Sequence, residues 1–98
     1  MTPQDFFKND LFAERAGIVL MEVREGYSKA RLEIKKEHLN AGNRTQGGAI
    51  FTLADLALAA AANSHGQLAF SLSSNITFLR ASGIGDTLYA EARERYIG

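Results

Sequence analysis

The sequence contains no cysteine among its 98 residues. This absence excludes disulfides, thiolate metal sites and cysteine nucleophiles. A bilayer-spanning helix needs about 18 or more consecutive apolar residues. The longest nearly apolar stretch, residues 49–62, is shorter than that and contains Thr52 and Asp55. The first five residues lack the basic and apolar regions of a signal peptide. We therefore expect a cytoplasmic protein that does not insert into membranes.

An excess of charge of either sign is also missing. Lys+Arg and Asp+Glu both total 11, so the formal net charge is zero. Nucleic-acid binders depend mainly on neutralising phosphates, and peripheral membrane binders on attraction to anionic lipids. We therefore expect neither partner. The two histidines, His38 and His65, lack a nearby carboxylate cluster at ligand spacing, so we predict no metal site and no bound cofactor.

The length suits one domain, residues 1–98, and the residue pattern predicts an α+β fold. The segment 1–16 reads as a short N-terminal helix that Thr2 can cap and Pro3 can begin. We expect strands at residues 18–23, 28–34, 68–79 and 87–96, because apolar residues recur there with β-strand spacing. The helix is expected to pack on the domain through an apolar stripe made of Phe6, Phe7, Leu11 and Phe12.

The segment 47–64 predicts a long central helix that is apolar on nearly all sides. Such a helix is normally buried all round. In a chain of this size a sheet can wrap one side of it, and a second subunit is the natural cover for the other. Asp55 lies near its middle, where an unpaired carboxylate is costly unless it has a function. Burial would raise its pKa, as suits a general base, although a wet groove would explain the residue equally well.

Gln46, Gly47 and Gly48 open this helix. The first backbone N–H groups of a helix lack internal partners and carry partial positive charge, so they can hold an anion or oxyanion. A plain glycine turn is the alternative. Gly47 and Asp55 are eight residues apart, about 12 Å along a helix, which is too far for both to reach one reacting atom. Two antiparallel helices from two chains would bring them together.

These segments together resemble the phenylacetate-degradation type of hotdog-fold thioesterase, over roughly residue 16 to the end. The resemblance lies in residues 38–42, 46–48, 51–55, 62–66, 76–80 and 85–88. It implies a hotdog fold, in which an antiparallel sheet wraps one long helix. It also implies a homodimer, or a tetramer of two dimers, that hydrolyses acyl-CoA at a site shared between subunits. Coenzyme A is then part of the substrate.

The resemblance also implies a role for individual residues. Asp55 matches the general base or nucleophile, and the N–H of Gly47, beside Gly48, would polarise the thioester carbonyl. Asn40 would help to hold the attacking water or the thioester. The remaining candidates are a helper hydroxyl at Ser73, or at Ser74 if the match shifts by one, and contacts to coenzyme phosphates from Arg44 and Arg80.

Two departures from the family pattern leave other functions open. Gln46 stands where the family usually has histidine, and glutamine donates a hydrogen bond but does not titrate. The family's domain normally continues with one or two further strands, so the C-terminal strands are expected to be shortened. A non-catalytic acyl-CoA-binding dimer is one alternative. The other is an acyl-thioester dehydratase or hydratase, for which His38 is the only candidate catalytic histidine.

Overall fold

The computed structural model describes residues 2–64, 72–77 and 83–94 of the chain. The elements in these residues follow the order α1 (Pro3–Phe7), α2 (Leu11–Ala16), β1 (Val19–Arg24), β2 (Tyr27–Glu33), the 3-10 helix η1 (Lys36–His38), α3 (Gly47–Ala62), β3 (Leu72–Thr77) and β4 (Thr87–Glu94). No helix within the described residues is long and apolar enough to cross a membrane.

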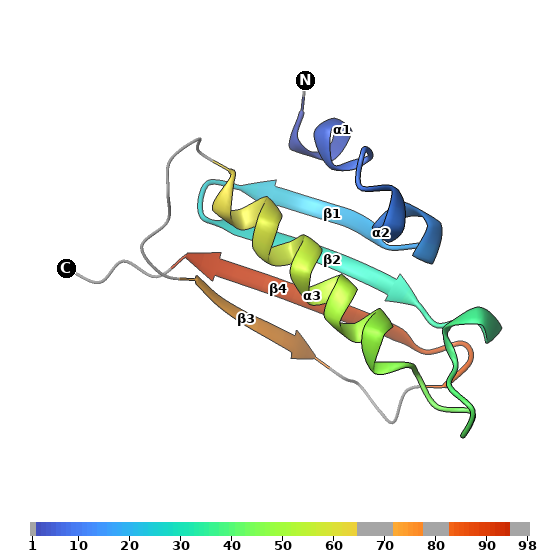
Figure 1. Cartoon of the computed structure of the whole chain (residues 1–98). Helices are drawn as coiled ribbons and strands as arrows, with labels where there is room; N and C mark the ends of the chain where they lie inside the picture. The colour runs from blue at the N-terminus through green and yellow to red at the C-terminus, as the bar shows by residue number, and fades with distance from the viewer. Residues whose placement is uncertain (1, 65–71, 78–82, 95–98) are drawn as a thin grey trace.

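The strands form one antiparallel sheet in the order β1-β2-β4-β3, and α3 lies along one face of it (Figure 1). The N-terminal helices lie beside this layer, where α1 contacts β1 and α2 contacts α3. The arrangement confirms the expected α+β fold with an antiparallel sheet against one long helix. The four predicted strands are present, although part of the predicted strand 68–79 lies outside the described residues.

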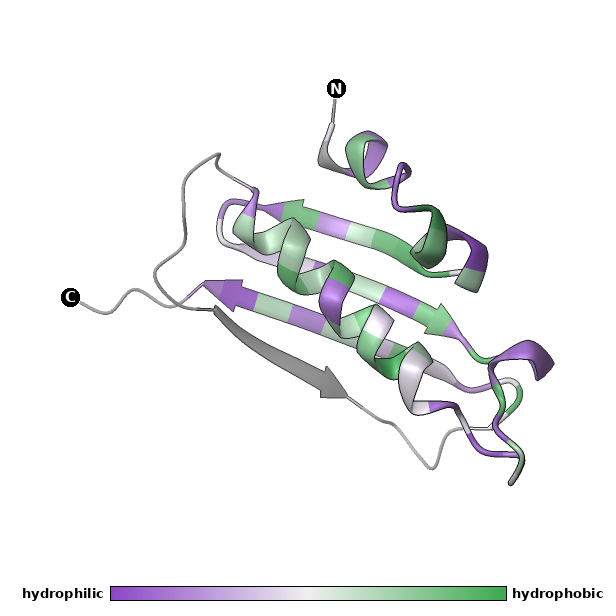
Figure 2. Cartoon of the chain, viewed as in Figure 1, coloured by the Kyte–Doolittle hydropathy of each residue, from purple (hydrophilic) through white to green (hydrophobic). Residues whose placement is uncertain are grey.

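Strand β2 has the period-2 alternation that the sequence predicts. Ala30 and Leu32 are fully buried, whereas Arg31 and Glu33, which alternate with them, are exposed. Apolar and polar residues also alternate along β4 (Figure 2). One face of the sheet therefore supplies the core, and the other carries the charged side chains.

Small side chains hold α3 close to the sheet. Ala57 and Ala61 of the helix are fully buried, and so are Ala30, Ala90 and Ala92 of the sheet. All five belong to one apolar cluster. Because neither surface carries bulk at these positions, the helix backbone can approach the strands closely, which is how a tightly packed interior is reached.

Two hydrogen bonds fix α3 along its axis relative to the β1–β2 hairpin. The buried Ser28 Oγ donates to the carbonyl oxygen of Ala57 at 2.5 Å. The Gly26 N–H donates to Ser64 Oγ at 2.8 Å, beyond the end of the helix. Gly26 has a φ of 73°, and an added Cβ would lie 2.9 Å from a carboxylate oxygen of Glu94. Glycine is thus favoured at this turn.

The opposite face of α3 is open in the single chain. Phe51 is 80% exposed and Asp55 is also exposed, whereas Leu53 between them is fully buried. The prediction that sheet wrapping leaves one side of the helix uncovered is confirmed. The expectation of a buried carboxylate is wrong for the single chain, because the sheet covers only the face that carries Leu53.

The N-terminal segment contains two short helices rather than the single helix predicted. The side chain of Asp10 accepts a hydrogen bond from the Ala13 N–H at 3.1 Å, and this cap starts a second helix. The predicted apolar stripe is only partly used. Phe7 packs against the core, but Leu11 is 60% exposed and Phe12 is 73% exposed.

The outer face of the sheet contains one buried phenol. The Tyr27 hydroxyl donates to Glu91 Oε2 at 2.8 Å. Its ring lies between Arg24 and Arg93, whose guanidinium carbons are 4.3 Å and 4.7 Å from the ring centroid. Burial, together with the hydrogen bond to the Glu91 carboxylate, raises the pKa of Tyr27 above its ordinary value of 10.0.

We predict that Tyr27 makes stability depend on pH at the alkaline end. Since the pKa is raised by folding, the stabilisation is fully present below pH 10.0 and is lost as the pH rises through the folded-state pKa. Urea unfolding of the wild type and of Tyr27→Phe, from neutral pH to above pH 10, measures this. The difference in unfolding free energy between the two proteins should shrink as the phenol ionises. A constant difference would contradict the assignment.

Candidate functional site

The start of α3 presents two backbone donors. Gln46 is the N-cap residue, in an extended conformation (φ −63°, ψ 131°), and its side chain makes no capping hydrogen bond. Within the described part of the chain, the N–H groups of Gly47 and Gly48 have no hydrogen-bond partner. A Cβ added at Gly47 would meet no atom within 4 Å. The predicted donors are therefore unpartnered and accessible.

The loop before α3 is shaped by Asn40. Its Oδ1 accepts hydrogen bonds from the N–H groups of Gly42 at 2.9 Å and Arg44 at 3.1 Å. The Asn40 N–H in turn donates to the Arg44 carbonyl at 2.7 Å, which closes the loop. Asn40 thus acts on the loop with its oxygen, and its Nδ2 has no partner among the residues described. Arg44 is exposed on the same loop.

His38 joins three segments at the base of this loop. Its Nδ1 accepts from the Lys35 N–H at 2.9 Å, and its Nε2 lies 2.5 Å from the carbonyl oxygen of Ala16, the last residue of α2. With Nδ1 accepting, Nε2 carries the proton and donates to Ala16. The His38 carbonyl accepts from the Gln46 N–H at 2.7 Å. Sequence reasoning missed this structural role.

Because both ring nitrogens of His38 are engaged by the backbone, they are not available to exchange protons with a substrate. A dehydratase would therefore lack its candidate histidine among the described residues. These residues also contain no group of three His, Cys, Asp or Glu side chains that could hold a metal ion.

Asp55 and the start of α3 line two different cavities. Asp55 lines a cavity of about 440 Å³ together with Asp10, Phe12, Phe51 and Thr52. Gln46 and Gly48 line a larger cavity, of about 600 Å³, which His38 and residues of α2 also line. The two cavities share Phe12 and Thr52. In the single chain, Asp55 and Gly48 therefore line two neighbouring cavities and not one common cavity.

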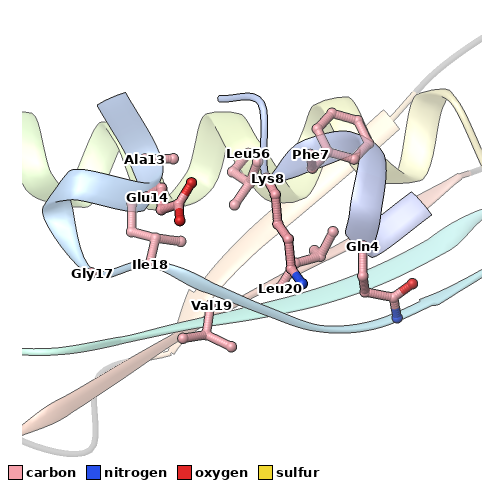
Figure 3. A pocket seen from close by; sticks show the side chains of 10 residues that line it. All are labelled: Gln4, Phe7, Lys8, Ala13, Glu14, Gly17, Ile18, Val19, Leu20 and Leu56. Carbon is pink, nitrogen blue, oxygen red and sulfur yellow. The ribbon is translucent and has the colours of Figure 1, made fainter. Parts of the chain in front are cut away.

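A third cavity, of about 290 Å³, shares no lining residue with these two. It lies between the N-terminal helices and the start of β1, with Leu56 of α3 also lining it (Figure 3). Side chains such as Phe7, Ile18 and Leu20 surround it. It contains none of the residues predicted for the site.

The remaining predicted residues lie on or after β3. The backbone of Ser73 pairs with Arg93, and that of Ser74 pairs with Ala92. Arg80 lies outside the described residues.

The chain is similar to proteins of known family. A model of the thioesterase superfamily matches residues 42–98. A protein of Archaeoglobus fulgidus that carries an esterase description is 48% identical over 92 residues, which cover 94% of this chain and 60% of that protein. The acyl-coenzyme A thioesterase PaaI of Escherichia coli is 37% identical over 92 residues, which cover 94% of this chain and 66% of that protein.

Solved structures show the same relationship. The Escherichia coli PaaI protein from the phenylacetic acid degradation operon matches with a TM-score of 0.72 and 36% identity, over 95% of this chain and 71% of that one. A hypothetical thioesterase from Streptococcus pneumoniae, solved with coenzyme A, matches with a TM-score of 0.70 and 25% identity, over 94% of this chain and 74% of that one. The chain spans about 60% of the length of the Archaeoglobus relative.

We predict that Asn40→Ala lowers the free energy of unfolding by about 1 kcal/mol, since two backbone N–H groups lose a solvent-exposed acceptor. Asn40→Asp keeps the acceptor and should unfold nearly as the wild type does. Urea unfolding compares them. Equal losses in both variants would contradict the loop role.

Proposed function

The chain belongs to the thioesterase superfamily, and from that premise we propose that it hydrolyses an acyl-CoA thioester. The pair of unpartnered N–H groups at Gly47 and Gly48 carries the proposal. A thioester carbonyl develops negative charge on its oxygen when water attacks, and preorganised N–H donors stabilise that charge. The positive end of the α3 dipole adds to the effect.

Asp55 supplies the second half of the chemistry. Its carboxylate accepts a proton from water while the water oxygen bonds to the carbonyl carbon. The C–S bond then breaks, and the proton passes to the departing thiolate, which leaves the free acid and coenzyme A. Asp55 is exposed in the single chain, so water can reach it.

Gln46 is compatible with this chemistry as a hydrogen-bond donor. Its side chain makes no capping bond, so its amide N–H₂ is available to the thioester oxygen. No step requires this position to change protonation. Gln46 cannot titrate as the histidine usual at this position does, and this favours a second candidate function, in which the chain binds acyl-CoA without hydrolysing it.

Acyl-CoA as substrate is supported by the named relatives. One is called an acyl-coenzyme A thioesterase, and structural neighbours were solved with coenzyme A and with acetyl CoA. Arg44 is exposed on the loop that leads to Gly47, where its guanidinium could contact a coenzyme phosphate.

We infer that the site is completed by a second copy of the chain. Gly47 and Asp55 are about 12 Å apart along α3, and Gly48, the residue after Gly47, lines a different cavity from Asp55, so one chain does not bring the donors and the carboxylate to one carbonyl. An antiparallel second α3 against the open face would place Asp55 of one copy beside Gly47 of the other. The same contact would bury Phe51, which is 80% exposed in the single chain. We therefore propose a homodimer as the active unit, with a tetramer of two dimers as a larger assembly.

Gly47→Pro tests the oxyanion donor directly. Proline suits the first position of a helix, and the extended conformation of Gln46 is compatible with a following proline. The substitution thus removes one N–H while the helix start is retained. We predict a fall in kcat of about 10²–10³, the usual cost of one lost oxyanion donor. A thiol-release assay measures it.

Gly83→Ala is the control for folding and handling, because a Cβ there also meets no atom within 4 Å. Full activity of Gly47→Pro would contradict the oxyanion role. Measurable acyl-CoA binding by the wild type with no turnover would favour the binding function instead.

Mixing chains tests the shared site. Asp55→Asn and Gly47→Pro should each have little activity alone. In a refolded equal mixture half of the dimers are mixed, and each mixed dimer has one intact site of two, so about a quarter of wild-type activity should return. No recovery, with mixed dimers present by native mass spectrometry, would show that each site lies within one chain.

A further inference from the structure

The two cavities beside α3 are separated by an exposed aromatic side chain from outside the matched family region. Phe12 of α2 lines both cavities, and it is 73% exposed. The thioesterase match covers residues 42–98, so α2 is not part of it. A large apolar group left in water beside two cavities gains by burial against an apolar ligand.

The larger cavity offers chiefly apolar surface. Leu11, Phe12, Ala16 and Ala49 all line it. Its volume of about 600 Å³ lies within the range of small-molecule pockets.

Apart from the Gln46 side chain and the Gly48 N–H, which the proposed function assigns to the thioester oxygen, its uncharged polar groups are engaged elsewhere. The ring nitrogens of His38 bond to the backbone of Lys35 and Ala16. The Thr52 hydroxyl donates to the Gly48 carbonyl at 2.8 Å, so its hydrogen is used. The charged lining residues, Arg15 and Glu37, are exposed. The cavity therefore suits an uncharged ligand group that needs few hydrogen bonds.

The position of the larger cavity relative to the reacting carbonyl decides which part of a thioester would enter this cavity. Gly48, one of the two proposed oxyanion donors, lines the cavity, so a group attached directly to the carbonyl would lie next to the cavity. The neighbouring cavity is lined by Asp10 and Asp55, and two carboxylates disfavour coenzyme phosphates there.

We propose that the larger cavity binds the acyl group, that this group is apolar and uncharged, and that Phe12 is the residue that limits its size. This inference rests on the proposed function, because it takes the carbonyl position from the oxyanion donors. Phe12 is held in place by its helix. Asp10 caps the start of α2, and His38 binds the carbonyl of Ala16 at its end.

The test compares Phe12→Ala and Phe12→Trp with the wild type. Isothermal titration calorimetry measures the dissociation constants of non-hydrolysable acyl-CoA ketone analogues that increase in acyl size from acetyl upward. The quantity compared is the ratio of the dissociation constants for small and large acyl analogues. In Phe12→Ala this ratio should shift by about tenfold toward tighter binding of the larger acyl groups, and in Phe12→Trp toward tighter binding of the smaller ones. About tenfold is the lower end of the discrimination that one methylene group produces in an apolar pocket.

Phe6→Ala is the matched control, because Phe6 is also an exposed aromatic of the N-terminal helices, at 55%, and lines neither cavity. It should keep the wild-type ratio. An unchanged ratio in both Phe12 variants would overturn the proposal, as would a wild type that binds no analogue. If Phe12→Ala only dissociates the oligomer in light scattering and leaves the ratio unchanged, a second chain covers Phe12 and the proposal fails.

A thiol-release assay run in parallel separates the two claims. A wild type without turnover whose analogue binding still depends on Phe12 would refute hydrolysis and support the acyl pocket. Turnover in a wild type whose analogue binding does not depend on Phe12 would support hydrolysis and refute the acyl pocket.

Discussion

The close packing of α3 on the sheet is the contact on which the other features depend. Alanines on both surfaces, such as Ala57 and Ala90, allow the helix to approach the strands, and the Ser28 hydroxyl fixes it by bonding to the Ala57 carbonyl. Once the helix is held this way, its first turn presents two N–H groups that have no hydrogen-bond partner among the described residues. The same packing turns Asp55 and Phe51 outward, away from the strands.

That geometry accounts for an incomplete site in the single chain. A helix is rigid, so eight residues separate the donors and the carboxylate by about 12 Å whatever the surrounding loops do. Under the proposed function, α3 of a second copy would supply the missing half of the site. The N-terminal helices add an aromatic wall at Phe12 between the two halves.

Sequence patterns predicted the helices and strands that depend only on residues close together in the chain. The alternation in β2 and the glycine-led start of α3 are set by neighbouring residues, and both are confirmed. The sequence left open whether Asp55 is buried or exposed, because this depends on which face the sheet covers. The role of His38 was also missed, since its partners, Lys35 and Ala16, are backbone groups that no side-chain pattern marks. The site roles of Ser73 and Arg80 remain predictions.

A crystal structure with a non-hydrolysable acyl-CoA ketone tests the central claim most directly. The account predicts that the ketone oxygen lies about 3 Å from the Gly47 nitrogen of one chain, and that the Asp55 carboxylate of a second chain faces the same carbon. A ketone bound away from the start of α3, or one approached by Asp55 of the same chain that supplies Gly47, would contradict it.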